Sequence, residues 1–184
     1  MFHLQIDPAY AGISLQSVTL PKDTELILQH LKTEIYNPSW KLKPAPEPFE
    51  KSYTLLLRSL GSGAFFLFDH ERILFMLEIG PMKKTNFGKY YDVLSNDYYI
   101  QVILSFGDAT LEPTAIRALQ ACLDGILLHT EVSRIVFPVF YNRPEGLLRR
   151  IVKGAGFVLL EDPMQPGKPA VYAYSQNSVQ PGEK

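Results

Sequence analysis

A strand–helix–strand succession in residues 98–140 limits the possible folds of this chain more than any other feature. Residues 98–106 and 134–140 are apolar runs typical of buried strands. Residues 113–129 between them predict a helix with Pro113 in its first turn. Its wide apolar stripe comprises Ala115, Ile116, Leu119, Cys122, Leu123, Ile126 and Leu127. A connection of this length predicts two parallel strands joined by a right-handed crossover, and therefore an α/β fold.

Apolar spacing in the rest of the chain predicts further strands and helices. Period-two runs indicate strands at 2–6, 13–20, 64–68, 72–79, 157–160 and 170–174, of which 64–68 and 72–79 form a hairpin. Helical spacing indicates helices at 23–37, 49–60 and 144–155. We expect one domain over residues 1–175 and a polar tail at 176–184. Its sheet should be mixed, mostly antiparallel and twisted, with about seven strands, an extra N-terminal strand and four flanking helices.

The composition argues against several classes of partner. The 184 residues carry a net charge of −1, so the chain lacks the excess of positive charge that is typical of nucleic-acid-binding proteins. A single cysteine, Cys122, suits a reducing compartment, and no apolar run is long enough to span a membrane. The N-terminus has no signal-peptide pattern, and the four histidines have no metal-binding spacing. We therefore expect a cytoplasmic protein with no metal, no nucleic-acid partner and no membrane partner.

The order of elements after residue 6 resembles that of the GNAT acyltransferase superfamily. The local sequence Arg150-Ile-Val-Lys-Gly-Ala-Gly-Phe is similar to the superfamily's pattern at the end of its last long helix. There, Gly156 would act as the C′ residue and Phe157 would begin the next strand. The resemblance covers almost the whole chain and implies the GNAT fold.

A narrower set of residues resembles the GNAT branch that acetylates hydroxylysine in siderophore synthesis. The shared features lie in one order over about 130 residues. They are Asn37-Pro38-Ser39-Trp40, Glu78, Tyr90-Tyr91-Asp92, Asp97, Pro138, Asn142 and Lys168. The resemblance implies that the acceptor is a small amine or hydroxylamine.

The resemblance also implies acetyl-CoA as cosubstrate, with its pyrophosphate on backbone N–H groups at the start of the 113–129 helix. GNAT proteins use a Gln/Arg-x-x-Gly-x-Gly/Ala loop at this point, whereas residues 105–114 here read Ser-Phe-Gly-Asp-Ala-Thr-Leu-Glu-Pro-Thr. Asp108 and Glu112 add negative charge, so we expect weak binding; the alternative is a plain turn capped by an acidic residue. The expected cofactor-binding residues are Ile103, Leu104, Ser105, Gly107, Thr110, Thr114 and Asn142.

The base of the siderophore branch is missing at its usual positions. The resemblance implies a His in the 98–106 strand and an Asp after the 134–140 strand, and this chain has Gln101 and Val139 there. Glutamine can position a nucleophile but cannot accept its proton. Tyr141 and Glu78 are the remaining candidates for a catalytic role. Glu78 either binds a substrate amine or faces water. Asn142 either forms a hydrogen bond to pantetheine or caps a helix.

Three functional interpretations remain open. The first is an acetyl-CoA-dependent N-acetyltransferase for a small amine or hydroxylamine, in which Gln101 orients the nucleophile and Trp40 contacts the substrate. In this interpretation, the backbone of residues 103–105 meets pantetheine. The second is a catalytically inactive GNAT-fold protein that binds a small ligand or a protein partner. The third is an unrelated α/β domain, and a homodimer is compatible with each.

Overall fold

The structure, a computed structural model of the chain, has a seven-stranded sheet as its centre. It describes residues 2–31, 46–85, 91–105, 108–129, 131–140, 146–161 and 169–175. The strands are β1 (Ile13–Ser17), β2 (Gly63–Asp69), β3 (Arg72–Pro81), β4 (Asp97–Leu104), β5 (Arg134–Phe140), β6 (Val158–Glu161) and β7 (Pro169–Tyr174). Their order across the sheet is β1-β2-β3-β4-β5-β7-β6. All neighbours are antiparallel except β4 and β5, which are parallel.

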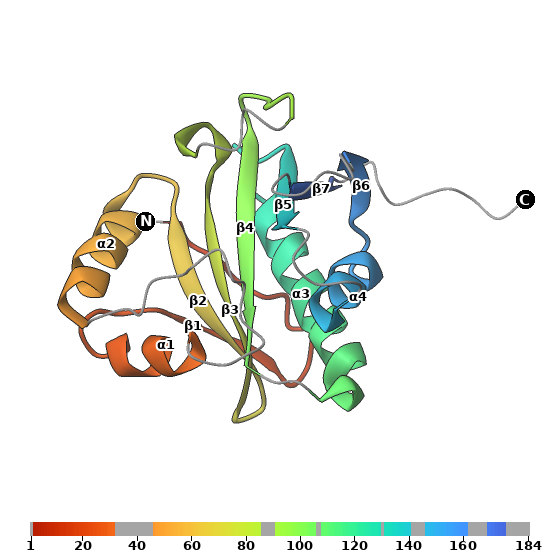
Figure 1. Cartoon of the computed structure of the whole chain (residues 1–184). Coiled ribbons are helices and arrows are strands. Elements are labelled where there is room, and N and C mark those ends of the chain that lie inside the picture. The colour runs from red at the N-terminus through yellow and green to blue at the C-terminus, as the bar shows by residue number, and fades with distance from the viewer. Residues whose placement is uncertain are drawn as a thin grey trace, which may run out of the picture.

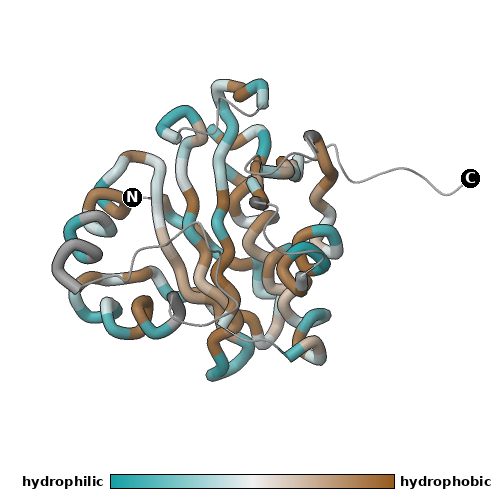
Figure 2. The backbone as a smooth tube through the Cα atoms, in the orientation of Figure 1, coloured by the Kyte–Doolittle hydropathy of each residue, from teal (hydrophilic) through white to brown (hydrophobic). Residues whose placement is uncertain are grey.

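The helices cover both faces of this sheet (Figure 1). They are α1 (Thr24–Leu31), α2 (Pro46–Arg58), α3 (Glu112–Leu127) and α4 (Leu147–Gly154), with short 3-10 helices η1 (Met82–Lys84) and η3 (Ala109–Leu111). α1 and α2 pack on one face, and α3 and α4 lie on the other. The tube coloured by hydropathy shows both apolar and polar residues along the helices, as expected for helices with one buried side (Figure 2).

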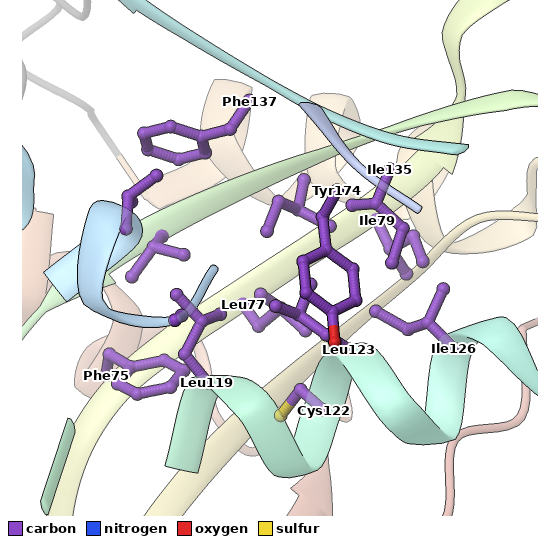
Figure 3. Close-up of a cluster of buried hydrophobic side chains, with 14 of the residues drawn as sticks. Phe75, Leu77, Ile79, Leu119, Cys122, Leu123, Ile126, Ile135, Phe137 and Tyr174 are labelled. Carbon is purple, nitrogen blue, oxygen red and sulfur yellow. The ribbon is translucent and has the colours of Figure 1, made fainter. Parts of the chain in front are cut away.

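The larger part of the core lies between the sheet and α3. Leu119, Cys122, Leu123 and Ile126 of α3 are fully buried, and they lie under apolar side chains of β3 and β5 (Figure 3). Pro113 stands in the first turn of α3, where its missing N–H removes no helical hydrogen bond. The predicted helix face is therefore confirmed, and so is the packing role of Cys122.

A smaller core lies on the other face of the sheet. Ile27 of α1 and Tyr53 of α2 pack there on Phe66 of β2 and Met76 of β3. Because side chains alternate along a strand, Leu77 and Ile79 face α3, whereas Met76 and Glu78 face α2. This alternation decides which polar side chains can meet at a site.

The N-terminal segment corrects the expectation of an extra strand. Residues 2–7 form no strand, although Phe2 and Leu4 are buried in the core as the alternation predicted. The segment is held by separate contacts: the Phe2 N–H donates to the Ser62 carbonyl, and His129 Nε2 lies 2.6 Å from the His3 carbonyl oxygen. It packs so closely on α3 that a Cβ on Gly125 would lie 2.3 Å from the Gln5 oxygen.

The predicted parallel pair is confirmed, and it is short. β4 and β5 pair only from Asp97 to Tyr99 on β4 and from Arg134 to Val136 on β5. Beyond Tyr99, β4 continues for five residues and pairs there with β3 alone. β5 likewise continues to Phe140 and pairs with β7. The two parallel strands are therefore paired at their starts and unpaired at their ends, which leaves one edge of β4 without a strand partner among the described residues.

Candidate functional site

Glu78 is a buried carboxylate in the middle of the sheet. It lies on β3, exposes 4% of its surface, and has Gln101 of β4 as its cross-strand partner. The Tyr53 hydroxyl of α2 donates a hydrogen bond of 2.7 Å to Glu78 Oε1. The alternative in which Glu78 faces water is therefore wrong, because the strand alternation turns this side chain toward α2.

Burial changes the acid–base behaviour of this carboxylate. Removal from water raises the pKa of Glu78 from its usual 4.5 to about 7, while the hydrogen bond from Tyr53 acts in the opposite direction. A carboxyl group with this pKa exists in both protonation states near neutral pH. It can therefore accept a proton in one step and release it in the next, as a general base must.

Tyr99 is the aromatic neighbour of this carboxylate. It stands opposite Gly80 in the β3–β4 ladder, and a Cβ at position 80 would lie 2.8 Å from Tyr99 Cε1. Glycine at this position therefore lets the ring lie against the strand. Burial first, and then the negative charge of Glu78, raise the pKa of Tyr99, so its phenol remains neutral.

Gln101 lies on the same face of the sheet as Glu78. Its neighbours Ile100 and Val102 belong to the core under α3, so Gln101 between them faces α2. Val139 instead packs against the core on the α3 side. Positions 101 and 139 therefore do not share a face, and a His and an Asp at these positions would not form the acid–base pair that the sequence resemblance implied.

The residues that the sequence resemblance implied for pantetheine contact lie at the end of β4. Ile103 and Leu104 lie in the part of β4 that has no strand partner on its β5 side. Ser105 follows, and its N–H donates to the Leu74 carbonyl. The Ser105 Oγ atom is buried and has no hydrogen-bond partner in the described part of the chain. A buried hydroxyl in this state is available to a polar ligand group.

The turn before α3 is capped by its own acidic residue. Asp108 accepts a hydrogen bond of 2.9 Å from the Thr110 N–H, and this bond lowers the pKa of the Asp108 carboxyl. Thr110 lies in η3, and Thr114 in the first turn of α3. The capping alternative is thus present in the structure, while Gly107 lies outside the described residues.

Glu112 has a partner that the sequence did not reveal. Arg150 Nε of α4 donates a hydrogen bond of 2.8 Å to Glu112 Oε2. The next arginine, Arg149, donates to the Tyr172 hydroxyl at 2.6 Å. Both arginines therefore form side-chain hydrogen bonds within the domain. The negative charge of Glu112 at the start of α3 is partly offset by an adjacent guanidinium.

A charged clamp holds β4 and β5 together where their pairing begins. Arg134 donates to both carboxylate oxygens of buried Asp97, at 2.8 and 2.6 Å. The Leu94 N–H and the Tyr91 hydroxyl also donate to Asp97 Oδ2. This bidentate pair joins the starts of the two parallel strands, and the strands diverge only beyond it.

Several predicted site residues cannot be placed. Trp40, Tyr141, Asn142, Asn37, Tyr90 and Lys168 lie outside the described residues, as does the 176–184 tail. Within the described ranges, no group of three or more His, Cys, Asp or Glu side chains is arranged to hold a metal ion. Among those same residues, no helix is long and apolar enough to cross a membrane.

Neither a protein-family model nor a curated protein matches the sequence, but solved structures match the fold. The aminoglycoside acetyltransferase AAC(6')-Ib, in complex with ribostamycin and coenzyme A, aligns with a TM-score of 0.75. The two chains are 13% identical, and the match covers 94% of this chain and 98% of that one. An uncharacterized protein from Bacillus halodurans aligns with a TM-score of 0.72 and 17% identity, over 90% of this chain and 85% of that chain.

A spermidine N-acetyltransferase chimera from Vibrio cholerae and hSSAT aligns with a TM-score of 0.63 and 14% identity. The match covers 91% of this chain and 97% of that chain. These identities show similarity of fold alone. Together with the diverging parallel strands β4 and β5, they show that this chain has the GNAT acetyltransferase fold.

Proposed function

We propose that this protein is an acyl-CoA-dependent N-acyltransferase for a small amine or hydroxylamine, with Glu78 as the proton acceptor. The observation that carries the proposal is a buried carboxylate with a pKa near neutrality on β3, directly opposite Gln101 of β4, the strand whose other edge is unpaired. No described cation pairs with Glu78, and a carboxylate buried in this way is unfavourable for stability, which supports a chemical role.

The residues at the end of β4 fit a coenzyme A thioester. The unpaired edge over Ile103 and Leu104 offers backbone N–H and C=O groups, which suit the amides of pantetheine. The buried Ser105 hydroxyl without a protein partner adds a polar group at the same end of the strand. The start of α3 supplies N–H groups for the diphosphate, and Arg150 offsets the charge of Glu112 there. The thioester supplies an activated acyl carbon when it is bound.

Each protein group then has a defined task. Glu78 removes a proton from the acceptor nitrogen as that nitrogen bonds to the acyl carbon, and the sulfur leaves with the bonding electrons of the broken C–S bond. Gln101 orients the nitrogen from the neighbouring strand with its side-chain amide, which can both donate and accept hydrogen bonds. The proton held by Glu78 is then released to the leaving thiolate or to solvent.

The charges of the described site residues also indicate how many charged groups the acceptor should carry. Among the described members of the residue set that resembles the hydroxylysine acetyltransferases, Glu78 and Asp97 are the buried carboxylates. Of the two, Asp97 is paired with Arg134, whereas Glu78 has no cationic partner in the described part of the chain. The acceptor is therefore expected to place one nitrogen, rather than several charged groups, beside the described part of the site.

Two measurements test the proposal. The first is thermal unfolding with and without acetyl-CoA, since a ligand that binds only the folded state raises the unfolding temperature, and the increase grows with ligand concentration relative to Kd. The second is release of free thiol during incubation with hydroxylysine, lysine and simple alkylamines. Stabilisation with amine-dependent thiol release is expected. Stabilisation without thiol release for any amine would favour the inactive binding protein, and no stabilisation would contradict both.

A further inference from the structure

Glu50 and Tyr53, on adjacent turns of helix α2, form hydrogen bonds to α1 and β3. The Thr24 hydroxyl of α1 donates to Glu50 Oε1 at 2.8 Å, and Tyr53, three residues later on α2, donates to Glu78 Oε1 at 2.7 Å. Residues three apart on a helix lie on the same side, so one side of α2 faces both contacts. The first bond is structural, whereas the second ends on the proposed base.

We propose that Tyr53 is a positioning residue that determines which carboxylate oxygen of Glu78 accepts the substrate proton. The proposal rests on the function proposed above. In it, Oε1 remains the acceptor of the Tyr53 hydrogen bond throughout the reaction, and Oε2 alone gains and loses the proton.

The chemistry of the phenol supports this assignment. Tyr53 has one hydroxyl hydrogen, which it donates in a hydrogen bond to Glu78 Oε1. A proton on Oε2 leaves Oε1 as a carbonyl oxygen, which still accepts this hydrogen bond. A proton on Oε1 would bring two hydrogens together and force the phenol to turn away. Met76 Sδ, 3.6 Å from the hydroxyl, is a much weaker acceptor.

The surroundings of Glu78 strengthen this preference. Its cross-strand neighbours are Ala64 on β2 and Gln101 on β4, and the phenol of Tyr99 lies close enough for its pKa to respond to the charge of Glu78. Burial and the Tyr53 bond are the two influences on the Glu78 pKa. The rotation of a carboxyl group in this environment is set by Tyr53, because Tyr53 is its hydrogen-bond donor from the covering helix.

The test compares Tyr53→Phe with the matched control Thr24→Val, which removes the hydrogen bond between Thr24 and Glu50. Two quantities are measured in each variant: the pH dependence of kcat/KM, and the titration of Glu78 itself by infrared difference spectroscopy against Glu78→Gln. Loss of a hydrogen bond to a charged group should move both midpoints upward in Tyr53→Phe by about one to two pH units. Activity at pH 7 should fall on the order of tenfold or more, and recover at higher pH.

Thr24→Val should lower the unfolding temperature and leave both midpoints in place. An unchanged carboxyl titration in Tyr53→Phe would overturn the role of Tyr53. An equal loss of activity at every pH would also overturn it, since that is the behaviour of a purely structural contact. A shifted titration in a protein whose wild type turns over no amine would instead overturn the proposed function, so the two failures are distinguishable.

Discussion

Replacing Glu78 by glutamine should stabilise the protein at alkaline pH. The pKa of Glu78 is about 7 in the folded protein and 4.5 ordinarily, so the folded state binds a proton more tightly than the unfolded chain does. The wild type should therefore lose stability as the pH rises from about 4.5 to about 7, and the loss should be complete above pH 7. At about 1.4 kcal/mol per pH unit, the loss is about 3 kcal/mol.

Glutamine has nearly the same shape and can still accept the hydrogen bond from Tyr53, but it does not ionise. The Glu78→Gln variant should thus match the wild type near pH 4.5 and exceed it by up to about 3 kcal/mol at pH 8.5. For a chain of this length, that difference corresponds to an increase in unfolding temperature of roughly 6–12 °C.

Urea unfolding at a series of pH values measures this difference directly. Glu71→Gln, in the exposed turn between β2 and β3, is the matched control and should show no comparable trend. A Glu78→Gln variant that is less stable than the wild type at pH 8.5, or whose stability difference does not change with pH, would refute the argument. Either result would mean that the ionised carboxylate is satisfied in the folded protein.

Three other changes test the fold and the cosubstrate site. Leu119→Asp should unfold the protein because its carboxylate would be buried without a partner, whereas Cys122→Ala removes only one sulfur atom and should cost far less in urea unfolding. Asp97→Asn should destabilise by about 3–5 kcal/mol because it leaves Arg134 without its counter-charge, and equal stability would show that the clamp is dispensable. Glu112→Gln should strengthen acetyl-CoA binding by about 0.3–1 kcal/mol, since it removes a like charge at the start of α3; unchanged affinity in calorimetry at low salt would place the diphosphate elsewhere.

The sequence predicted the elements whose signals are local. The apolar stripe of α3, with Pro113 at its start, fixed the buried face of that helix, and the length of the connection fixed the parallel pairing of β4 and β5. The N-terminal residues show the limit of this approach. Phe2 and Leu4 alternate with polar residues because one side of the segment is buried, but alternation does not show whether the backbone pairs with a strand.

The candidate site depends on contacts between distant residues, which the sequence alone does not contain. Glu78 was identified as a candidate, but its burial depends on Tyr53, 25 residues earlier on α2. The one indication of this contact was a tyrosine among the leucines of an apolar helix face, since a buried phenol usually has a polar partner. The separation of Gln101 and Val139 onto opposite faces likewise follows from the sheet, and motif spacing does not reveal it.

The most direct test of the central claim is the pH dependence of acyl transfer in the wild type and in Glu78→Gln, with acetyl-CoA affinity measured in both proteins. The proposed role predicts a wild-type kcat/KM that rises with pH around a midpoint near 7. It also predicts that Glu78→Gln binds acetyl-CoA as tightly as the wild type but reacts about a hundredfold to ten-thousandfold more slowly at every pH. A variant that retains wild-type turnover and the same midpoint would contradict Glu78 as the proton acceptor.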